Sequence, residues 1–321
     1  MSNYRFFDRL RADAAAERRA IVAGLLASAP AIAPKHFYDP VGSALFGAIC
    51  ELPEYYPTRT EHAIFVEHRE EIAEAIGNGR QFVDLGAGDC RKAQGWLPFL
   101  APTRYIAVDI AGDALARALA RMAPEFPELE VTGIVADFTR GLDLRNDLGD
   151  VPAMFFYPGS SIGNFQPDDA RRFLSDIHLH CIASEASGRS GLLIGVDTKK
   201  ESRRLTAAYD DPLGVTAAFN RNVLRHVNQI VDANFDPAAF AHVAFYNEQQ
   251  GRIEMHLAAR TPHIVRIDGA SRAFDTGDLI HTEYSYKYTP AEFSALLQDA
   301  GFASIRCWQD AARDFAVYWA T

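Results

Sequence analysis

The chain has 321 residues, of which 48% are hydrophobic and 23% are charged, and its formal net charge at pH 7 is −10. This length and apolar content suffice for one large domain or two smaller domains with buried cores. The acidic excess repels phosphate backbones and anionic lipid headgroups, so it argues against nucleic-acid and membrane partners.

The sequence has no pattern typical of targeting, membrane insertion or metal binding. Residues 1–11 carry several charges without a following apolar run, unlike a secretion signal. No stretch reaches the roughly 18 uninterrupted apolar residues of a membrane span. The four cysteines are scattered and lack CxxC spacing (Cys50, Cys90, Cys181, Cys307). We therefore expect a cytoplasmic protein with free thiols and no bound metal.

The N-terminal part combines two predicted helices with an irregular segment between them. Helical spacing of apolar residues runs from about Asp13 to Ala27 and again from Glu61 to Ile76. The intervening residues 30–60 are rich in aromatic side chains and interrupted by prolines. We assign no regular element to this segment.

A β/α alternation follows and predicts an α/β fold. Five short apolar runs are typical of strands: Gln81–Leu85, Tyr105–Val108, Leu129–Val135, Ala153–Tyr157 and Gly191–Val196. Helical patterns separate these runs. Strands that alternate with helices imply a parallel, doubly wound sheet.

The C-terminal part predicts one helix and two strands. The helix covers Pro290–Gly301, and the strands cover Ala303–Trp308 and Phe315–Ala320. Between the fifth strand and this helix lie roughly 90 residues, from about 198 to 287, which is more than a loop needs. We interpret them as a second, smaller domain that the first 60 residues join.

The turn after the first strand of the alternation is a candidate ligand site. It has the sequence Asp-Leu-Gly-Ala-Gly and ends at Gly88. Glycines there let the backbone approach a ligand closely. The third glycine of a dinucleotide-binding GxGxxG is replaced by Arg91, and a simple tight turn explains the motif equally well.

Acidic residues at the ends of the next two strands strengthen the prediction of a nucleoside site. Asp109 can accept hydrogen bonds from ribose hydroxyls, Asp137 can accept one from an adenine amino group, and Phe138 can cover the ring. Either aspartate can instead cap a helix or a turn. Since no GxxxxGK[ST] motif is present, a nucleoside triphosphate is disfavoured.

Several segments together resemble one family, the histidine-specific Nα-methyltransferases of ergothioneine biosynthesis. They are Leu52-Pro-Glu-Tyr-Tyr-Pro-Thr-Arg-Thr-Glu61, Gly159-Ser-Ser-Ile-Gly-Asn164, Ala208-Tyr-Asp-Asp211 and Gly214-Val-Thr-Ala-Ala-Phe-Asn220. The resemblance extends over essentially the whole chain. It implies three successive methyl transfers from S-adenosylmethionine to the α-amino group of L-histidine. The products would be hercynine (Nα,Nα,Nα-trimethylhistidine) and S-adenosylhomocysteine, and no metal would take part.

The resemblance also implies the domain organisation. A class I (Rossmann-like) methyltransferase sheet would occupy residues 61–197 plus 288–321 and bind the cofactor. A smaller α+β substrate domain, formed by residues 1–60 plus 198–287, would be inserted between the fifth strand and the last helix. We expect a monomer because no amphipathic stripe is left over for an interface.

Site residues follow by matching the family's motifs. Those implied for the cofactor are Gly86, Lys92, Asp109, Asp137, Phe138, Gly159 and Ser160. Those implied for histidine are Phe46, Tyr55, Asn164, Tyr209, Thr216, Met255, Glu283 and Ser285, with Tyr38 near the reacting amine. The turn departs from the family, which commonly has Glu where this chain has Asp84 and Ser where it has Ala87. Cys90 and Arg91 also stand where polar residues are expected.

Elementary chemistry agrees with these roles. Glu283 and Ser285 are two residues apart, so on an extended segment both point to one side. Glu283 can accept one imidazole N–H, while Ser285 donates to or accepts from the other nitrogen. Asn164, Tyr55 and Tyr209 offer neutral donors to the α-carboxylate. Tyr38 and Tyr55 can accept hydrogen bonds from the amine, but the sequence does not name the final proton acceptor.

Each of these residues can also be explained by ordinary solvent exposure or core packing, without a role in binding. A lone Glu is more often solvated, and Met255, Phe46 and the tyrosines can be ordinary core residues. Two other functions stay open: a methyltransferase for another free amino acid such as tryptophan, tyrosine or an arginine derivative, and a cofactor-binding regulator without catalysis.

Overall fold

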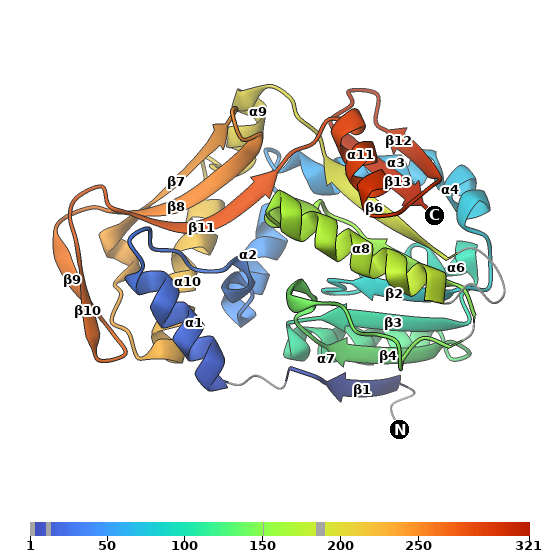
Figure 1. Cartoon of the computed structure of the whole chain (residues 1–321), viewed down its shortest axis with the longest axis horizontal. Helices are drawn as coiled ribbons and strands as arrows, with labels where there is room; N and C mark the ends of the chain where they lie inside the picture. Colours follow the sequence, from blue (N-terminus) through green and yellow to red (C-terminus); the bar gives the residue numbers. More distant parts are fainter. Residues whose placement is uncertain (1–3, 11–13, 150, 184–189) are drawn as a thin grey trace. The chain divides into compact units, whose positions relative to one another are not determined.

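The computed structural model describes residues 4–10, 14–149, 151–183 and 190–321, and this part of the chain forms two compact units (Figure 1). The first unit is drawn from Met1–Arg11, Pro57–Lys199 and Tyr288–Thr321. The second is drawn from Ala12–Tyr56 and Lys200–Lys287. The second unit therefore receives one segment from before the first unit's main part and one from within it.

The first unit contains an eight-stranded sheet in the order β1-β4-β3-β2-β5-β6-β13-β12. Its strands are β1 (Tyr4–Asp8), β2 (Gln81–Leu85), β3 (Arg104–Asp109), β4 (Glu130–Val135), β5 (Ala153–Tyr157), β6 (Gly191–Asp197), β12 (Ile305–Gln309) and β13 (Phe315–Ala320). Neighbouring strands are parallel except β13, which is antiparallel to both β6 and β12. This arrangement confirms the class I methyltransferase sheet expected from the sequence.

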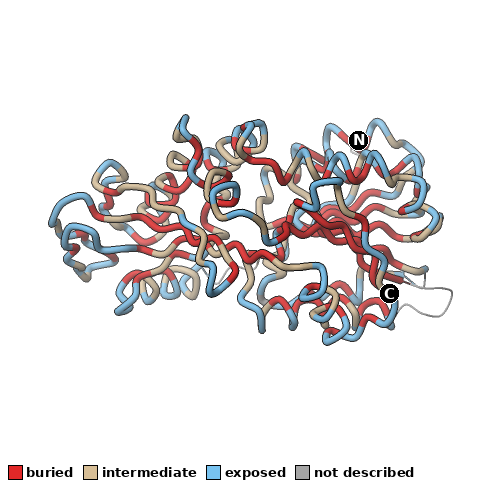
Figure 2. Tube along the Cα trace, turned by 90° about the horizontal axis from the view of Figure 1, so that it is seen from above, coloured by how far each residue is buried: buried red, intermediate tan, exposed pale blue. Residues whose placement is uncertain are grey.

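Helices cover both faces of this sheet because alternate strand residues point to opposite sides. One face carries α3 (Tyr56–Glu67), α4 (Arg69–Ile76), α5 (Arg91–Gln94), α6 (Leu97–Leu100) and α7 (Gly112–Met122). The other carries α8 (Pro167–Ala183) and α11 (Pro290–Asp299). Phe82 and Phe156 belong to the first core, whereas their neighbours Val83 and Phe155 belong to the second. Figure 2 shows the inner strands of this sheet buried along most of their length.

The N-terminal strand differs from the domain boundaries expected from the sequence. Residues 4–8 form β1, which pairs in parallel with β4 and so belongs to the first unit, not to the second. The strand lies at the sheet edge and is mostly exposed, so it lacks the apolar alternation that marks a half-buried strand. Phe6 packs beside Gly133, where an added Cβ would come within 2.9 Å of its ring.

The segment from 30 to 60 contains a helix that the sequence analysis did not assign. Helix α2 covers Pro40–Cys50, and its N-cap Asp39 accepts a hydrogen bond from Gly42 N at 2.7 Å. An Asp N-cap followed by proline at the first helical position is a recognisable start signal. The helix predicted from about Asp13 is observed as α1 (Ala14–Leu26), and Asp13 itself lies outside the described residues.

The second unit is built on a three-stranded antiparallel sheet in the order β11-β8-β7. Its strands are β7 (Phe240–Asn247), β8 (Arg252–Ala259) and β11 (Leu279–Tyr286), and a hairpin adds β9 (His263–Ile267) and β10 (Ala270–Phe274). The helices are α1, α2, α9 (Ser202–Ala207) and α10 (Val215–Val231). One apolar core joins them, with Phe219, Val223 and Val227 of α10 packed among residues of the sheet.

We predict that Gly191→Ala destabilises the first unit. Gly191 begins β6, and an added Cβ would lie 2.6 Å from the Trp319 ring and 2.7 Å from the Ala320 carbonyl oxygen on the adjacent β13. Neither the backbone nor the buried ring can yield easily, so we expect a loss of about 1–3 kcal/mol in the free energy of unfolding. Denaturant unfolding measures this loss. Gly149→Ala is the control, since its nearest neighbours would lie at 4.0 Å; equal stability of the two variants would contradict the steric argument.

Candidate functional site

The turn between β2 and α5 is held in place by the end of β3. Gly86 and Gly88 adopt left-handed backbone angles, with φ of 71° and 54°. Asp109 fixes the turn, because its Oδ2 accepts from Gly88 N and its Oδ1 from Ala111 N, both at 2.8 Å. The carboxylate is 9% exposed, and its burial raises its pKa despite these two backbone hydrogen bonds. The backbone of Ile110 also contributes a hydrogen bond that lowers this pKa, and a carboxylate with about four acceptor positions still has room for a further donor.

A second acidic residue supports the turn from below. Asp84 of β2 is 2% exposed, and Tyr105 donates a hydrogen bond from its hydroxyl to Asp84 Oδ2 at 2.7 Å. Burial raises the pKa of Asp84 to about 7, although the Tyr105 hydrogen bond acts in the opposite direction. Asp84 therefore contributes to the core of the first unit beneath the glycine turn.

An aromatic group borders the turn on the side of β4. The Phe138 ring stacks on Phe173 of α8 at 5.6 Å and meets the Tyr157 ring edge to face at 5.9 Å. An added Cβ on Gly86 would lie 3.9 Å from the Phe138 ring, so the two are neighbours. Asp137 accepts from Thr139 N at 3.2 Å, which is the turn-capping role weighed from the sequence.

A buried carboxylate links two loops of the cofactor side. Glu61 of α3 is 0% exposed. Its Oε1 accepts from Gly159 N at 2.7 Å, and its Oε2 pairs with Lys92 Nζ at 2.5 Å. The carboxylate fits under β6 because Gly195 has no side chain, since a Cβ there would stand 2.0 Å from Oε1. Sequence analysis placed Glu61 in a family-like segment without giving it a role.

The loop after β5 is anchored at its second residue as well. Gly159 and Ser160 both have positive φ, at 81° and 59°. Ser160 Oγ accepts a hydrogen bond from Asp197 N, at the end of β6, at 2.9 Å. The seven residues predicted for the cofactor thus lie at or just beyond the carboxyl ends of β2 to β5, where ligands bind in open α/β sheets.

In the second unit, the predicted aromatic residues form one cluster. Ring-centroid distances are 5.8 Å for Tyr38–Phe46, 6.2 Å for Phe46–Tyr55 and 6.2 Å for Tyr55–Tyr209, all edge to face. Phe219 of α10 packs against Phe46 at 6.0 Å. These contacts hold the rings rigidly and leave the phenol oxygens as their polar ends.

The carboxylate of Glu283 is buried, so the interpretation as a solvated strand residue is wrong. Glu283 and Ser285 lie on β11, are 7% and 2% exposed, and Glu283 stands opposite Met255 on β8. A register shift between His281 and Glu283 interrupts the strand pairing just before them. Burial raises the pKa of Glu283 to about 7, while the positive charge of Lys287 lowers it.

Lys287 completes a polar triangle that sequence analysis missed. Its Nζ donates to Tyr209 Oη and to Ser285 Oγ, each at 2.9 Å, and these two hydroxyls are 2.8 Å apart. Lys287 is 2% exposed. The period of two that relates Glu283 to Ser285 continues to this residue, and Lys287 N still bonds to Gly251 O at 2.8 Å. This spacing of two residues is the sequence signal that could have pointed to Lys287.

Comparison with known proteins identifies the chain's family. The family model described as "Histidine-specific methyltransferase, SAM-dependent" matches residues 17–321. The chain belongs to this family. It is 40% identical over 316 residues to a Histidine N-alpha-methyltransferase of Mycolicibacterium smegmatis, with 96% of each chain covered. It is 36% identical over 310 residues to the protein of that name from Mycobacterium tuberculosis, covering 94% of this chain and 93% of the relative.

A fungal relative matches over part of its own length. Ergothioneine biosynthesis protein 1 of Neurospora crassa is 29% identical over 280 residues, which is 84% of this chain and 31% of that protein. Membership of the histidine-specific methyltransferase family agrees with the sheet order of the first unit and with the resemblance found in the sequence motifs.

The other residues predicted for the amino acid lie as follows in this histidine-specific methyltransferase. Asn164 ends the short helix η4 (Ser161–Asn164) of the first unit and is half-buried. Thr216 lies in the first turn of α10, where its backbone N–H donates to Asp211 Oδ1 at 2.7 Å. Within the described ranges, no group of three or more His, Cys, Asp or Glu side chains is placed to hold a metal ion, and no helix could cross a membrane.

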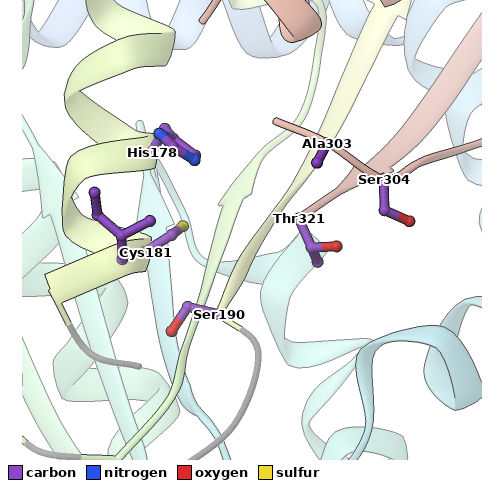
Figure 3. Close-up of a pocket in the computed structure, with 7 residues that line it drawn as sticks. His178, Cys181, Ser190, Ala303, Ser304 and Thr321 are labelled. Carbon is purple, nitrogen blue, oxygen red and sulfur yellow. The ribbon is translucent and has the colours of Figure 1, made fainter. Parts of the chain in front are cut away.

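A pocket elsewhere in the first unit does not coincide with the predicted site. Figure 3 shows it lined by His178, Cys181, Ser190, Ala303, Ser304 and Thr321, together with Ile182. Ser190 directly precedes β6, and Thr321 follows β13, which runs antiparallel to β6. The pocket therefore lies by the amino end of β6, whereas the glycine turn follows the carboxyl end of the parallel strand β2.

We predict that Asp109→Ala weakens S-adenosylmethionine binding by about 1.5–3 kcal/mol, or roughly tenfold to 150-fold in affinity. The variant removes both a charged acceptor and the carboxylate that fixes the glycine turn. Calorimetric titration with the cofactor, with thermal unfolding alongside, measures the effect. Asp143→Ala, at an exposed position of the same unit, is the control. Unchanged affinity in a folded Asp109→Ala protein would remove this residue from the site.

Proposed function

We propose that this protein transfers three methyl groups in turn from S-adenosylmethionine to the α-amino group of L-histidine. The product is hercynine, and the reaction is the first step of ergothioneine biosynthesis. Family membership supports the reaction. The observation that carries the choice of substrate is the buried pair of Glu283 and Ser285, which matches the two nitrogens of an imidazole ring.

The first unit offers the groups that S-adenosylmethionine requires. The buried Asp109 carboxylate keeps lone pairs for ribose hydroxyls, and the glycine turn allows close approach of the backbone. Phe138 borders the turn with an aromatic ring for the adenine. The remaining residues assigned to the cofactor are Lys92, Gly159 and Ser160. Glu61 bonds to both Lys92 and Gly159, and Ser160 follows Gly159 in the loop after β5.

The second unit contains most of the groups that we assign to histidine binding. Glu283 accepts an imidazole N–H and Ser285 contacts the other ring nitrogen, with Met255 and Phe46 as apolar neighbours. Tyr55 and Tyr209 donate to the α-carboxylate, and Asn164 of the first unit is assigned the same role. A site built around a buried carboxylate rejects an apolar isostere, because the carboxylate would lose its partner.

S-adenosylmethionine supplies a methyl group that is already activated, so the chain's main task is to hold the amine in line with it. The amine must be neutral to react. Tyr38 and Tyr55 accept its hydrogen bonds and thereby orient the nitrogen lone pair. Burial raises the pKa of Tyr55 well above its ordinary value of 10, so this phenol stays neutral and acts as a hydrogen-bonding group, not as a strong base.

Two competing functions make different predictions from this one. A methyltransferase for another amino acid would turn over an aromatic or arginine-derived substrate faster than histidine. A regulator without catalysis would bind the cofactor without turnover. Mass spectrometry of the purified protein with S-adenosylmethionine and histidine decides between them, since only the proposed reaction adds three methyl groups to histidine. The same assay with tryptophan and tyrosine ranks the substrates.

The setting of the enzyme follows from simpler properties. Within the described residues, the four cysteines (Cys50, Cys90, Cys181 and Cys307) form no disulfide, which suits the reducing cytoplasm. We assign the protein to the cytoplasm as a monomer, with a small-molecule substrate and no metal. Size-exclusion chromatography with light scattering tests whether the protein is a monomer. Metal analysis of the active protein tests whether it works without a bound metal.

We predict that Asn164→Ala raises the KM for histidine strongly with little change in cofactor affinity. The amide is one of the neutral donors assigned to the α-carboxylate. For the same reason histamine, which lacks the carboxylate, should be a poor substrate of the unmodified enzyme. Steady-state kinetics with both amines measures this. Histamine turnover equal to that of histidine would contradict the assignment.

We predict that Glu283→Ala abolishes the preference for histidine. Truncating one partner of a buried charged hydrogen bond costs about 2–5 kcal/mol, so kcat/KM for histidine should fall by roughly 30-fold to several-thousand-fold. Phenylalanine, which has no ring N–H, and tryptophan, whose indole N–H differs in position from the imidazole N–H, should lose nothing. A competition assay with both substrate classes gives the ratio.

The control for this variant is Glu248→Ala, which removes an exposed carboxylate of the same unit. It should leave both substrate preference and cofactor binding unchanged. If Glu283→Ala keeps the parent's preference for histidine, the imidazole is read by other residues.

A further inference from the structure

The polar triangle in the second unit has a feature that histidine recognition by Glu283 and Ser285 does not explain. Its third member, Lys287, is a cation that is 2% exposed. Burying an ammonium group is costly unless it is hydrogen-bonded and near an opposite charge. Lys287 therefore indicates a function that repays this cost, or a structural role that a neutral side chain could fill equally well.

The hydrogen bonds of Lys287 constrain the protons of its neighbours. An ammonium group has three donors and no acceptor, so Tyr209 Oη and Ser285 Oγ both accept from Nζ, each at 2.9 Å. The two hydroxyls are 2.8 Å apart, and one of them donates to the other. This bond uses one hydroxyl proton. The second hydroxyl proton points out of the triangle, so only one of the two hydroxyls can donate to a ligand at a time: Tyr209 to the α-carboxylate or Ser285 to the ring nitrogen.

Lys287 also acts on Glu283, because its Nζ reaches back along the same face of the extended chain to Ser285 Oγ at 2.9 Å, two residues from Glu283. Burial favours the protonated form of this carboxyl group, and the nearby ammonium favours the ionised form. An ionised Glu283 accepts an imidazole N–H, whereas a protonated one competes as a donor. The charge of Lys287 therefore bears directly on the group that is assigned to recognise the ring.

We propose that Lys287 is a positioning residue for the amino-acid substrate, which orients the hydroxyls of Tyr209 and Ser285 through its two hydrogen bonds and places a positive charge beside Glu283. The inference rests on the proposed function for its choice of ligand. It adds a charged residue that acts through the hydrogen-bonding state of three residues assigned to bind the substrate.

Other titratable groups face the same region, and their titration must be distinguished from that of Glu283. They are Tyr38, Cys50 of α2, Tyr55, Tyr209 and His242 of β7, whose Nε2 lies 2.8 Å from Tyr209 O. Burial lowers the pKa of His242 and raises that of Tyr55. On β8, Glu254 and His256 flank Met255 and, by strand alternation, point to the opposite face. All these groups are present in both proteins when a Lys287 variant is compared with its parent.

The decisive experiment measures the ionisation of Glu283 without any ligand. In ¹³C-glutamate-labelled protein, the side-chain carboxyl resonance missing from Glu283→Gln belongs to Glu283. We expect Lys287→Met, a substitution of similar length without charge, to raise the midpoint of its titration by about one pH unit or more. Lys287→Arg should restore the parent's midpoint. Lys35→Met, which removes a half-buried charge paired with Glu17 in the same unit, should leave it unchanged.

Kinetics with histidine then test the positioning role. If the midpoint moves from 7 to 8, the ionised fraction at pH 7 falls from about one half to about one tenth, so KM for histidine should rise about fivefold beyond any pH-independent loss. The ratio of KM between Lys287→Met and parent should fall as pH rises to 9, because Glu283 ionises again. Titration of histidine itself cancels in this ratio. In a Glu283→Gln background the pH dependence of the ratio should vanish.

The outcomes separate the two claims. An unmoved Glu283 midpoint, or a KM ratio that is the same at every pH, means that Lys287 is only structural and overturns the inference. Failure of the parent enzyme to methylate histidine overturns the proposed function, while the ligand-free titration still decides whether Lys287 controls Glu283.

Discussion

The parallel pairing of β2 with β3 is the constraint on which the cofactor side of this protein depends. Their register sets Leu85 beside Val108, so the glycine turn and Asp109 emerge next to each other at the same edge of the sheet. The backbone N–H groups of Gly86 and Ala87 donate to Val108 O, and that of Gly88 donates to the Asp109 carboxylate, so these bonds join the two strand ends. One rigid carboxylate thereby shapes the turn and presents acceptors beside it.

The second unit positions its polar groups by different means. Antiparallel pairing and the period of two along β11 bring Glu283, Ser285 and Lys287 to one face, beside the aromatic cluster. Their burial makes each polar group dependent on its neighbours, since leaving a buried polar group unpaired costs about 1–3 kcal/mol, against roughly 1 kcal/mol for the net contribution of a typical hydrogen bond. Selectivity for a ligand with a matching N–H follows from this mutual dependence.

Sequence reasoning recovered the elements that buried apolar runs encode. Strands β2 and β5 were predicted at their observed bounds, and only the family resemblance singled out Glu283. It missed β1, which is an exposed edge strand, and α2, whose start signal lay within an aromatic segment. Glu61 and Lys287 were missed for another reason. Charged residues are usually solvated, and the partners that bury Glu61 are 31 and 98 residues away along the chain.

Because Gly195 has no side chain, the residue allowed at position 195 depends on the residue at position 61, which is far away along the chain. Any larger residue there displaces the Glu61 carboxylate, which holds Gly159 and Lys92 together on the far side of the strand ends. A methyl group added in the middle of β6 would then register in a mutational screen as a ligand-affinity defect, although the altered residue belongs to the sheet interior. A side chain at position 195 would need room made both at residue 61 and beside the Phe315 ring, which an added Cβ would approach to 2.9 Å.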